Sequence, residues 1–551
     1  MSTNRITKST AIIAVAIFLT NLFFRYFTLT DCGIWYDEAF SIFYSQKELY
    51  LIKNTSQWDI APPFYYYLLH YWMILFGVEE NAVRMLSVLF TCIASSLLFI
   101  FVHRYFNLRI ALFASILFFT SNEIFYYSQE TRTYSLLVFF AVASSFCFIE
   151  LIRNPKWYWM VMLATINWAA IYSHYFFLFI PAIQFVTVLF SGNKKTIFYL
   201  VLSFVITALL FGNWLNRIYE VLMHGSVSNE ITTLHLHDLF KLIKSLAGES
   251  ILFYSLLPLV VAGIFYFLKS KNKFENNFQY LTLIYVFMWA LFPVLIIYIL
   301  SNGRGGIFIS RYLLYTIPAF CILLSFFISK IPVHKKLYYP IVLVALFIGL
   351  FSINYNFSKS TDYKNLVPYV MNEKNKDALV IVQTTAMIPL FTYYFDRNIF
   401  INHTDLEKKM MYKNVIFKDD SSTMDNYISN GYSKVILIQS FQPNPDNIVS
   451  YLNKRFKTAI GNFNFPMSNI TVFSNPFNDS LFSQEVRFST LMKNFMQTKY
   501  DLRFNYYKNQ LMNSEEWLNS IRKQSLDSGI HLDTVLKNNI IYLINQENNK
   551  Q

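Results

Sequence analysis

Apolar stretches of about 20 residues recur along the chain up to residue 355, and they constrain the fold more than any other feature of the sequence. Such a stretch crosses a bilayer as one α-helix, because lipid offers no hydrogen-bond partner to an unpaired backbone group. The shorter run Phe64–Phe76 is rich in Tyr and is expected to form an interfacial or re-entrant helix. Eleven spans are predicted, at residues 11–29, 85–102, 110–127, 133–152, 157–175, 177–192, 197–215, 251–268, 279–300, 311–329 and 337–355.

The composition also favours a polytopic α-helical membrane protein. Hydrophobic residues make up 55% of the 551 residues and charged residues 14%, whereas a soluble domain carries about 25% charged residues. The net charge of +13 is not gathered in a compact run of Lys and Arg, so no nucleic-acid partner is expected. Three of the four cysteines, Cys92, Cys147 and Cys321, lie inside apolar stretches, which predicts neither a disulfide framework nor a cysteine metal cluster.

The basic residues indicate how the chain is oriented in the membrane. Loops that face the cytoplasm carry an excess of Lys and Arg. With the N-terminus in the cytoplasm, every predicted inside turn is basic, and these turns carry Arg104/Arg109, Arg153/Lys156, Lys194/Lys195, Lys269/Lys271/Lys273 and Lys330/Lys335/Lys336. The sequence therefore predicts a multi-pass protein of the cytoplasmic (inner) membrane, with residues 30–84, 216–250 and 358–551 facing outward.

The residues that follow the last predicted span have the character of a soluble domain. Short β-branched runs predict strands, and polar stretches near them are typical of helices. The predicted strands are Leu379–Gln383, Val435–Gln439 and Ile470–Phe473, and the predicted helices are Thr361–Asn372 and Ser483–Phe495. We expect a helical membrane domain over residues 1–357, followed by an extracytoplasmic α/β domain over residues 358–551.

The ionisable residues that could carry chemistry all belong to the predicted outer face. They are Asp37, Glu38 and Asp59 with Tyr66 in the first outer loop, Glu130, Arg132 and Tyr134 in the next outer turn, and Arg304 and Arg311 in the turn before the tenth span. Glycosyl transfer from a lipid phosphate needs a carboxylate that accepts the proton of the attacking hydroxyl. It also needs cations that stabilise the departing phosphate, and the fork of donors on Arg suits this role.

Five motifs in order strengthen this hypothesis: WYDEAFS, DIAPPFYYYLLHYW, GVEENAVRMLSVLF, SQETRTYSL and SRYLLYTIPA, followed by TDYKNLVPYV. Together they resemble the dolichyl-phosphate-mannose-protein mannosyltransferase superfamily, a family 39-like group of GT-C glycosyltransferases that includes the aminoarabinose transferases of lipid A. The resemblance covers residues 10–395 and is most specific over residues 35–136.

The resemblance implies the GT-C fold, a polyprenyl- or dolichyl-phosphate sugar donor and inversion at the anomeric carbon. It implies that Asp37 is the catalytic base and that Asp59 positions the acceptor or assists. Many relatives carry His or Lys immediately before the Pro pair, where this chain has Ala61, so the phosphate contacts at this point are left open. We expect Arg132 to bind the substrate, with Arg304 or Arg311 contacting the lipid phosphate. The other residues expected to bind substrate are Glu38, Glu130, Tyr134 and Tyr66.

Each of these residues also has a structural interpretation. Asp37 could be a solvated residue at a helix start, and Glu38 could hold the loop rather than react. Arg132 could be a snorkelling anchor, and the arginines before the tenth span could be interfacial charges. His235, His237 and Asp238 in the second outer loop could bind a metal by residue type, but a run of this kind is usually solvated surface. His70 and His174 are expected to line helix contacts.

Two other functions remain as alternatives to a glycosyltransferase. One is a lipid-linked sugar transporter or flippase, which usually has ionisable or helix-breaking residues in the middle of the membrane. The other is a non-catalytic membrane scaffold with an outer binding domain. No cofactor is predicted beyond the lipid-phosphate sugar, which is a substrate, and a divalent metal requirement is left open. The expected partners are membrane lipids and an acceptor that is a protein, lipid A or another glycan.

Overall fold

The protein is described from a computed structural model. The structure describes residues 7–29, 32–54, 62–224, 234–248, 250–270, 277–302, 308–332, 335–355, 362–373, 378–401, 405–421, 424, 427–428, 432, 434–440, 446–456, 459–465, 468–474, 504, 507–508, 511–512, 515–528 and 531–548. The chain divides into two compact units, Met1–Lys359 and Ser360–Gln551, which we call the helical unit and the sheet unit.

Each of the eleven predicted spans falls on apolar helix in the described part of the helical unit. These helices are α1 (Lys8–Tyr26), α5 (Glu80–Tyr105), α6 (Leu108–Phe119), α8 (Tyr134–Arg153), α9 (Trp157–Ile171), α10 (Phe179–Leu189), α11 (Lys194–His224), α13 (Ser250–Lys269), α14 (Asn277–Ser301), α15 (Ile317–Ile328) and α16 (Lys335–Ser352). Six stretches are long and apolar enough to cross a membrane, at Lys8–Tyr26, Glu80–Tyr105, Tyr134–Arg153, Lys194–Gly212, Phe278–Ser301 and Ser310–Ile328. The other five are apolar but shorter, so the number eleven stays a prediction.

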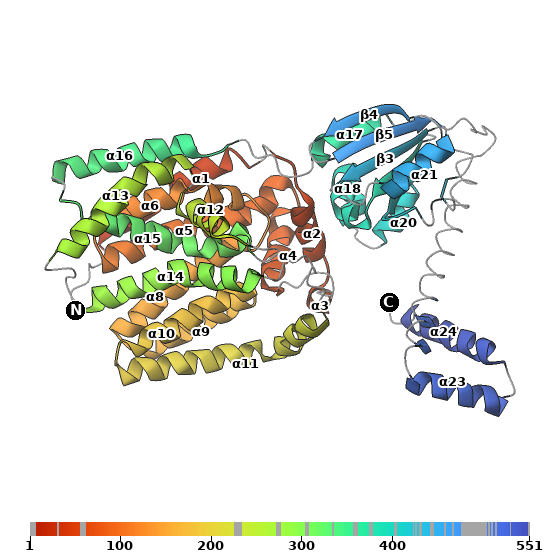
Figure 1. Cartoon of the computed structure of the whole chain (residues 1–551), viewed down its shortest axis with the longest axis horizontal. Helices are drawn as coiled ribbons and strands as arrows, with labels where there is room; N and C mark the ends of the chain where they lie inside the picture. The colour runs from red at the N-terminus through yellow and green to blue at the C-terminus, as the bar shows by residue number, and fades with distance from the viewer. Residues whose placement is uncertain are drawn as a thin grey trace. The chain divides into compact units, whose positions relative to one another are not determined.

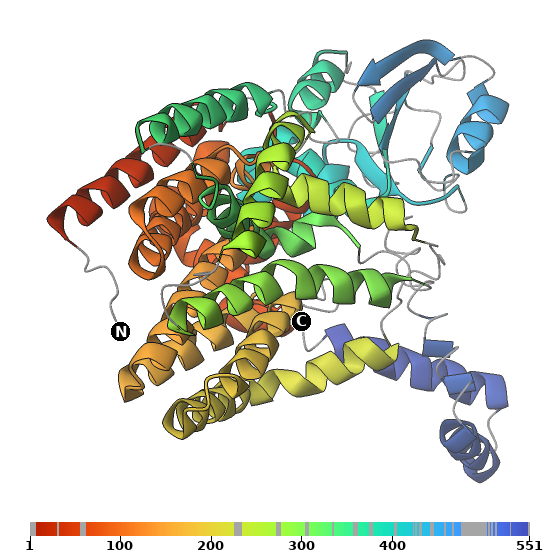
Figure 2. The same ribbon diagram turned by 60° about the vertical axis from the view of Figure 1, so that its left-hand side comes forward.

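The helices of the helical unit lie side by side around α5 and α8 (Figure 1, Figure 2). Helix α5 packs against α1, α6 and α8, and α15 packs against α6, α13 and α14. On α1, the side chains of Ile12, Leu19 and Phe23 are each more than half exposed. An apolar stripe turned outward in this way is expected where a helix meets lipid tails.

Polar side chains inside this bundle satisfy one another. Ser144 Oγ donates to Asn167 Oδ1 at 2.6 Å, and Asn167 Nδ2 donates to Gln184 Oε1 at 3.2 Å. Gln184 Nε2 donates back to Ser144 Oγ at 2.7 Å, which closes a ring between α8, α9 and α10. Such hydrogen bonds hold helices together where the surroundings are too apolar to offer other partners.

Short helices occupy the first two predicted outer segments, and others lie near the ends of the predicted spans. They are α2 (Tyr36–Ser45), α3 (Leu49–Asn54), α4 (Phe64–Phe76), α7 (Asn122–Tyr127), η1 (Tyr175–Leu178), α12 (Leu236–Ala247) and η2 (Ser310–Thr316). Helix α4 has the bounds of the predicted interfacial helix and packs against α2 and α5. It ends at Gly77, whose φ of 81° lies in the left-handed region that favours glycine, and whose N–H donates to the Met73 carbonyl.

The sheet unit contains a mixed five-stranded sheet in the order β2-β1-β3-β5-β4. Strand β1 is parallel to β2 and β3, whereas β5 is antiparallel to β3 and β4. The strands are β1 (Ala378–Gln383), β2 (Val415–Lys418), β3 (Lys434–Ser440), β4 (Ala459–Phe465) and β5 (Ser468–Ser474). The remaining helices are α17 (Tyr363–Glu373), α18 (Ile388–Phe395), α19 (Arg397–Ile401), α20 (Leu406–Met411), α21 (Asp446–Phe456), α23 (Glu515–Ser528) and α24 (Leu532–Asn548).

Helices cover both faces of this sheet. Ile416 of β2 packs in one apolar cluster with Leu452 of α21. The next residue, Phe417, points to the opposite face because side chains alternate along a strand. There it meets Phe391 of α18, with ring centroids 5.9 Å apart. The central strands are therefore buried on both sides, which explains why they are continuous apolar runs.

The three predicted strands are β1, β3 and β5, which are neighbours at the centre of the sheet. The sequence analysis missed β2, which is only four residues long, and β4, which contains Gly461 and two asparagines. The predicted helix Thr361–Asn372 overlaps α17, and the predicted helix Ser483–Phe495 lies outside the described residues. The placement of this unit outside the cytoplasm stays a prediction.

Close packing of α13 against α15 gives a test of the helical unit. A Cβ atom at Gly263 would lie 2.1 Å from the Phe327 carbonyl oxygen, whereas a Cβ at Gly212 of α11 would meet nothing within 4 Å. We expect Gly263→Ala to lower the free energy of unfolding by about 1–3 kcal/mol, because the helices must separate. Gly212→Ala, the matched control, should leave it unchanged or raise it by up to about 1 kcal/mol. Thermal melting in detergent checks this, and equal melting temperatures for the two variants would contradict the packing.

Candidate active site

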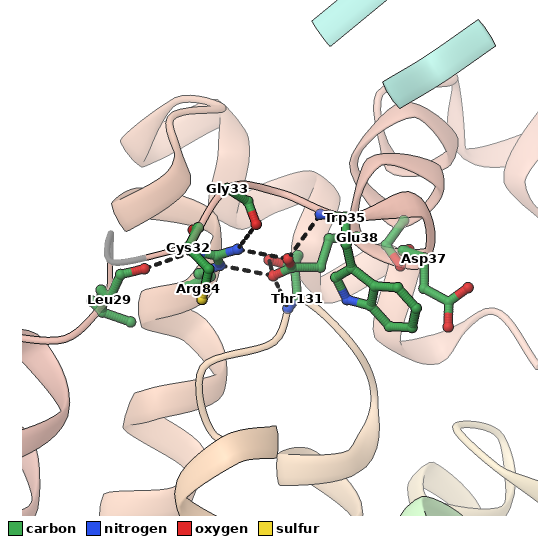
Figure 3. A network of polar contacts seen from close by, with 9 residues as sticks. Leu29, Cys32, Gly33, Trp35, Asp37, Glu38, Arg84 and Thr131 are labelled. Atoms are coloured by element: carbon green, nitrogen blue, oxygen red, sulfur yellow. Dashed lines mark hydrogen bonds and ion pairs between the residues drawn. The ribbon is translucent and has the colours of Figure 1, made fainter. Parts of the chain in front are cut away.

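The first turn of α2 carries two adjacent carboxylates, Asp37 and Glu38. Successive side chains on an α-helix point about 100° apart, so the two groups point in different directions. Figure 3 shows Glu38 pointing into a network of polar contacts and Asp37 directed away from it. The local geometry thus separates two residues that the sequence analysis assigned to one site.

Glu38 is fully buried and forms an ion pair with Arg84 of α5, which is also buried (Figure 3). Arg84 Nε donates to Glu38 Oε1 at 2.8 Å, and Arg84 Nη2 donates to Glu38 Oε2 at 2.7 Å. The Thr131 N–H also donates to Glu38 Oε1, at 3.0 Å. A paired fork of this kind is the strongest hydrogen-bonding arrangement that a carboxylate forms with a cation.

The remaining donors of Arg84 hold the chain that enters α2 (Figure 3). Nη1 donates to the carbonyls of Leu29 and Cys32 at 2.6 and 2.7 Å, and Nη2 donates to the carbonyl of Gly33 at 2.8 Å. The ion pair therefore joins the end of the first span, the first outer loop and α5. Because both oxygens of Glu38 are engaged and none of its surface is exposed, this geometry favours the alternative in which Glu38 holds the loop.

Asp37 lies at the surface of the helical unit beside Arg311 of η2. Arg311 Nη1 donates to Asp37 Oδ2 at 3.4 Å, and both side chains are partly exposed. The guanidinium of Arg311 also lies over the ring of Tyr312, 5.3 Å from its centroid. A long, partly exposed pair of this kind is weak, so both groups can exchange this contact for a substrate.

Arg132 belongs to the loop of residues 128–133 between α7 and α8, and four other segments hold this loop by hydrogen bonds. Arg132 Nη1 donates to Ser41 Oγ of α2 at 3.2 Å, which brings this arginine to the helix that carries Asp37. Glu130 lies in the same loop and is fully buried. The other contacts are Arg25 to Ser128, Gln129 to Thr28, Thr131 to Glu38, Ser87 to the Arg132 carbonyl and Thr133 to the Ser173 carbonyl.

The two predicted tyrosines are both buried. Tyr134 begins α8 and lies among rings, with the centroids of Tyr127 and Tyr312 at 5.4 and 6.5 Å. Tyr66 packs edge-on against Tyr44 at 4.8 Å. The structure thus places Tyr134 beside the Arg311 segment, whereas Tyr66 contributes to the contact between α4 and α2. Burial raises the pKa of the neighbouring Tyr65 well above its usual range, so this phenol is neutral near pH 7.

Two predicted site residues, Asp59 and Arg304, lie outside the described residues. His235 precedes α12, and His237 and Asp238 lie in its first turn, with His237 81% exposed. Among the described residues, no group of three or more His, Cys, Asp or Glu side chains could hold a metal ion.

The sequence analysis missed Arg84 and Arg25 as residues of this region. Both side chains are buried, and Arg25 Nε donates to Ser128 Oγ at 2.9 Å. The signal that could have found Arg84 is its position directly before the predicted span 85–102, because a charge at the edge of a membrane-spanning segment is costly to bury unless it is paired or functional.

Comparisons with known proteins agree with this fold. Residues 61–215 match the family described as dolichyl-phosphate-mannose-protein mannosyltransferase. The fold is similar to crystal structures of ArnT from Cupriavidus metallidurans. The structure bound to undecaprenyl phosphate has a TM-score of 0.55 and 11% sequence identity, and the apo structure has a TM-score of 0.51 and 13% identity. Each comparison covers 85% of this chain and 99% of the ArnT chain. No curated protein matches the sequence significantly.

The family match over residues 61–215 and the fold shared with the ArnT structures both support the resemblance that the motifs predicted. The roles of the individual site residues stay predictions, because at this level of identity the solved structures establish the fold alone.

The pair between Glu38 and Arg84 gives a test that is independent of activity. We expect Glu38→Gln and Arg84→Met each to lower the free energy of unfolding by about 3–5 kcal/mol, because each leaves a buried group without its partner. The double variant should lose much less than the sum of the two. Glu48→Gln, an exposed carboxylate in the same loop, is the control and should change it by less than about 0.5 kcal/mol. Thermal melting in detergent measures all four, and additive single effects would contradict the pairing.

Proposed function

We propose that the protein transfers a sugar from a polyprenyl-phosphate donor to an acceptor on the outer face of the cytoplasmic membrane, with Asp37 as general base. The observation that carries this proposal is the contact of Asp37 with Arg311, at 3.4 Å, on the helix that Arg132 also contacts. A carboxylate and two guanidinium groups from three segments distant in sequence thus gather around α2. Their chemistry matches the two charges that develop during transfer from a phosphate.

In the proposed reaction, Asp37 accepts the proton of an acceptor hydroxyl as its oxygen attacks the anomeric carbon. The bond between that carbon and the phosphate oxygen breaks, and the electron pair leaves with the polyprenyl phosphate. A single displacement of this kind inverts the anomeric configuration. Asp37 is partly exposed, as a base that must meet a macromolecular or lipid acceptor needs to be.

Arg311 and Arg132 are proposed to stabilise the leaving phosphate. Guanidinium groups match the geometry of phosphate oxygens and stay charged at all physiological pH values. Before the donor binds, Arg311 donates to Asp37. A phosphate competes for this arginine, and its arrival releases Asp37 to accept a proton. The roles expected for Asp59, which assists at the acceptor, and for Arg304, a further phosphate contact, remain part of this hypothesis.

Asp37 gives the direct test. Asp37→Asn keeps the shape of the side chain but cannot accept the proton, so transfer should fall by about 10²- to 10⁴-fold. Mass spectrometry of envelope glycolipids and glycoproteins would compare a deletion strain with strains complemented by wild type, Asp37→Asn and the control Asp238→Asn. We expect one sugar to be missing in the deletion strain and restored by wild type and Asp238→Asn alone. Full restoration by Asp37→Asn, or no missing sugar at all, would contradict the proposal.

The orientation needs a separate test, because the outer position of this site follows from the distribution of basic residues. Alkaline phosphatase fused after Gln551 should be active, and green fluorescent protein fused there should be dark. Fusions after Lys269, at the end of α13, should give the opposite pattern and serve as the control. An active fluorescent fusion after Gln551 would place the sheet unit in the cytoplasm and overturn the proposed side of transfer.

A further inference from the structure

A row of amide side chains crosses the sheet unit at one level, near the ends of the parallel strands β1 and β3. Gln439 of β3 is paired in register with Asn469 of β5, and Asn469 is paired with Asn464 of β4. On the other side of β3, Gln439 Nε2 donates to Gln383 Oε1 of β1 at 2.8 Å. Four neighbouring strands each contribute one side chain to this set, which we call the amide row.

All four amides point to the same face of the sheet. Side chains alternate along a strand, and directly paired residues of neighbouring strands share a face. Ile381 and Leu437 lie two residues before Gln383 and Gln439, and both belong to the apolar cluster that includes α21. The amide row therefore lies on the face that α21 covers (Figure 1), beyond the apolar cluster and toward the edge at which β1 and β3 end.

The amide row runs from the interior of the sheet to its surface. Gln383 is buried, Gln439 is half-buried, and Asn469 and Asn464 are exposed. Neighbouring strands are about 4.8 Å apart, so the row extends over roughly 14 Å. Each amide has two N–H donors and an oxygen with two acceptor positions. Within the described part of the chain, the bond between Gln439 and Gln383 is the one hydrogen bond of these four side chains.

The inner end of the row lies where open α/β sheets bind their ligands. Strands β1 and β3 are parallel neighbours, and the helices that follow them, α18 and α21, lie on opposite faces of the sheet. Ligands of such sheets bind outside the carboxyl ends of two strands related in this way. Gln383 is the last residue of β1, and Gln439 is the last but one of β3. The two glutamines therefore flank this position.

The backbone directly after Gln383 is strained. Thr384 has φ 78° and ψ 126°, a conformation that a β-branched residue rarely adopts. Its N–H donates to the Lys418 carbonyl of β2 at 2.8 Å, and its hydroxyl accepts from the Ala386 N–H at 3.4 Å. Strain of this kind clusters at sites that hold ligands. It is a second and independent indication of binding at the edge where β1 ends.

We infer that the amide row binds a neutral oligosaccharide. A sugar hydroxyl and a side-chain amide each donate and accept hydrogen bonds, so the two groups match in several orientations. Dinucleotides also bind at the ends of such strands, but they need glycines that let the backbone approach their phosphates. The turn Thr384–Met387 contains no glycine, and the amides carry no charge. The length of the row suits a chain of sugars better than a single small molecule.

This binding role goes beyond the proposed function and does not rest on it, because the amide row belongs to the sheet unit and the candidate active site to the helical unit. Two substitutions test the row. Asn469→Val and Gln439→Val remove an amide and introduce a side chain that favours strands. Asn469 is exposed, so its variant keeps the sheet folded even if Gln439→Val does not.

Two further variants are controls. Asn398→Ala removes an exposed amide from α19 of the same unit. Asp37→Asn reports on the candidate active site. Thermal melting of each variant checks that the fold is retained.

The experiment measures binding to the purified full-length protein by calorimetry, in a detergent whose headgroup contains no sugar. Maltohexaose, cellohexaose and chitohexaose are the neutral probes, and hexagalacturonate is the acidic comparison. We expect wild type to bind at least one neutral probe. Asn469→Val and Gln439→Val should each weaken that binding by about 3- to 10-fold, the usual value of a hydrogen bond between neutral groups. Asn398→Ala and Asp37→Asn should bind it as wild type does.

The remaining outcomes separate this inference from the proposed function. If wild type binds no neutral probe, or binds hexagalacturonate more tightly than all three, the inference is wrong. If both valine variants bind as tightly as wild type while Asp37→Asn binds weakly, the oligosaccharide occupies the candidate active site and the inference is overturned. If the valine variants bind weakly but Asp37→Asn restores transfer fully in the complementation test, the proposed function fails and the inference stands.

Discussion

The buried ion pair between Glu38 and Arg84 determines where the other groups of the candidate site can lie. It joins α2 to α5, and its remaining donors hold the backbone between the first span and α2. The N–H of Thr131 also donates to Glu38, so the loop that carries Arg132 is bonded to the same carboxylate. Substitution of one partner of such a pair is strongly destabilising, because the other charge is then buried without a partner and without access to water. One glutamate therefore sets the mutual positions of three segments that are distant in sequence.

This arrangement accounts for the different roles that we propose for the two neighbouring carboxylates. The helical turn directs Glu38 inward and leaves Asp37 near the surface (Figure 3). A general base must be reachable and must change its protonation state during turnover, whereas a residue that holds a loop must do neither. Glu38 forms a short, buried pair with Arg84, which suits the structural role. Asp37 forms a long, partly exposed contact of 3.4 Å with Arg311, which suits the proposed chemical role. The pair between Glu38 and Arg84 fixes α2, and α2 in turn positions Asp37 beside Arg311.

The sequence predicted the local features well and the long-range contacts poorly. Each predicted span falls on apolar helix, because hydropathy over about 20 residues depends only on the segment itself. The central strands were predicted for the same reason, whereas β2 is too short to show a pattern in isolation. The inward turn of Glu38, its pairing with Arg84 and the position of His174 beside Tyr312 depend on residues 46 or more positions away. No motif or periodicity in a single sequence encodes such contacts.

The loop that carries Arg132 shows how the helical unit uses buried charge. Arg25 is fully buried at the end of α1, where a snorkelling side chain would reach the interface instead. It donates to Ser128 of this loop, and its guanidinium lies 5.3 Å from the centroid of the Phe125 ring. A cation in such a position is costly, since desolvation is offset only by hydrogen bonds and aromatic faces. This cost is intelligible if the loop must be held rigid, because a guanidinium that stabilises a developing charge acts only from a fixed position. Arg25 and Glu38 would then hold the two ends of one loop, so that Arg132 faces α2 without having to be ordered by the substrate.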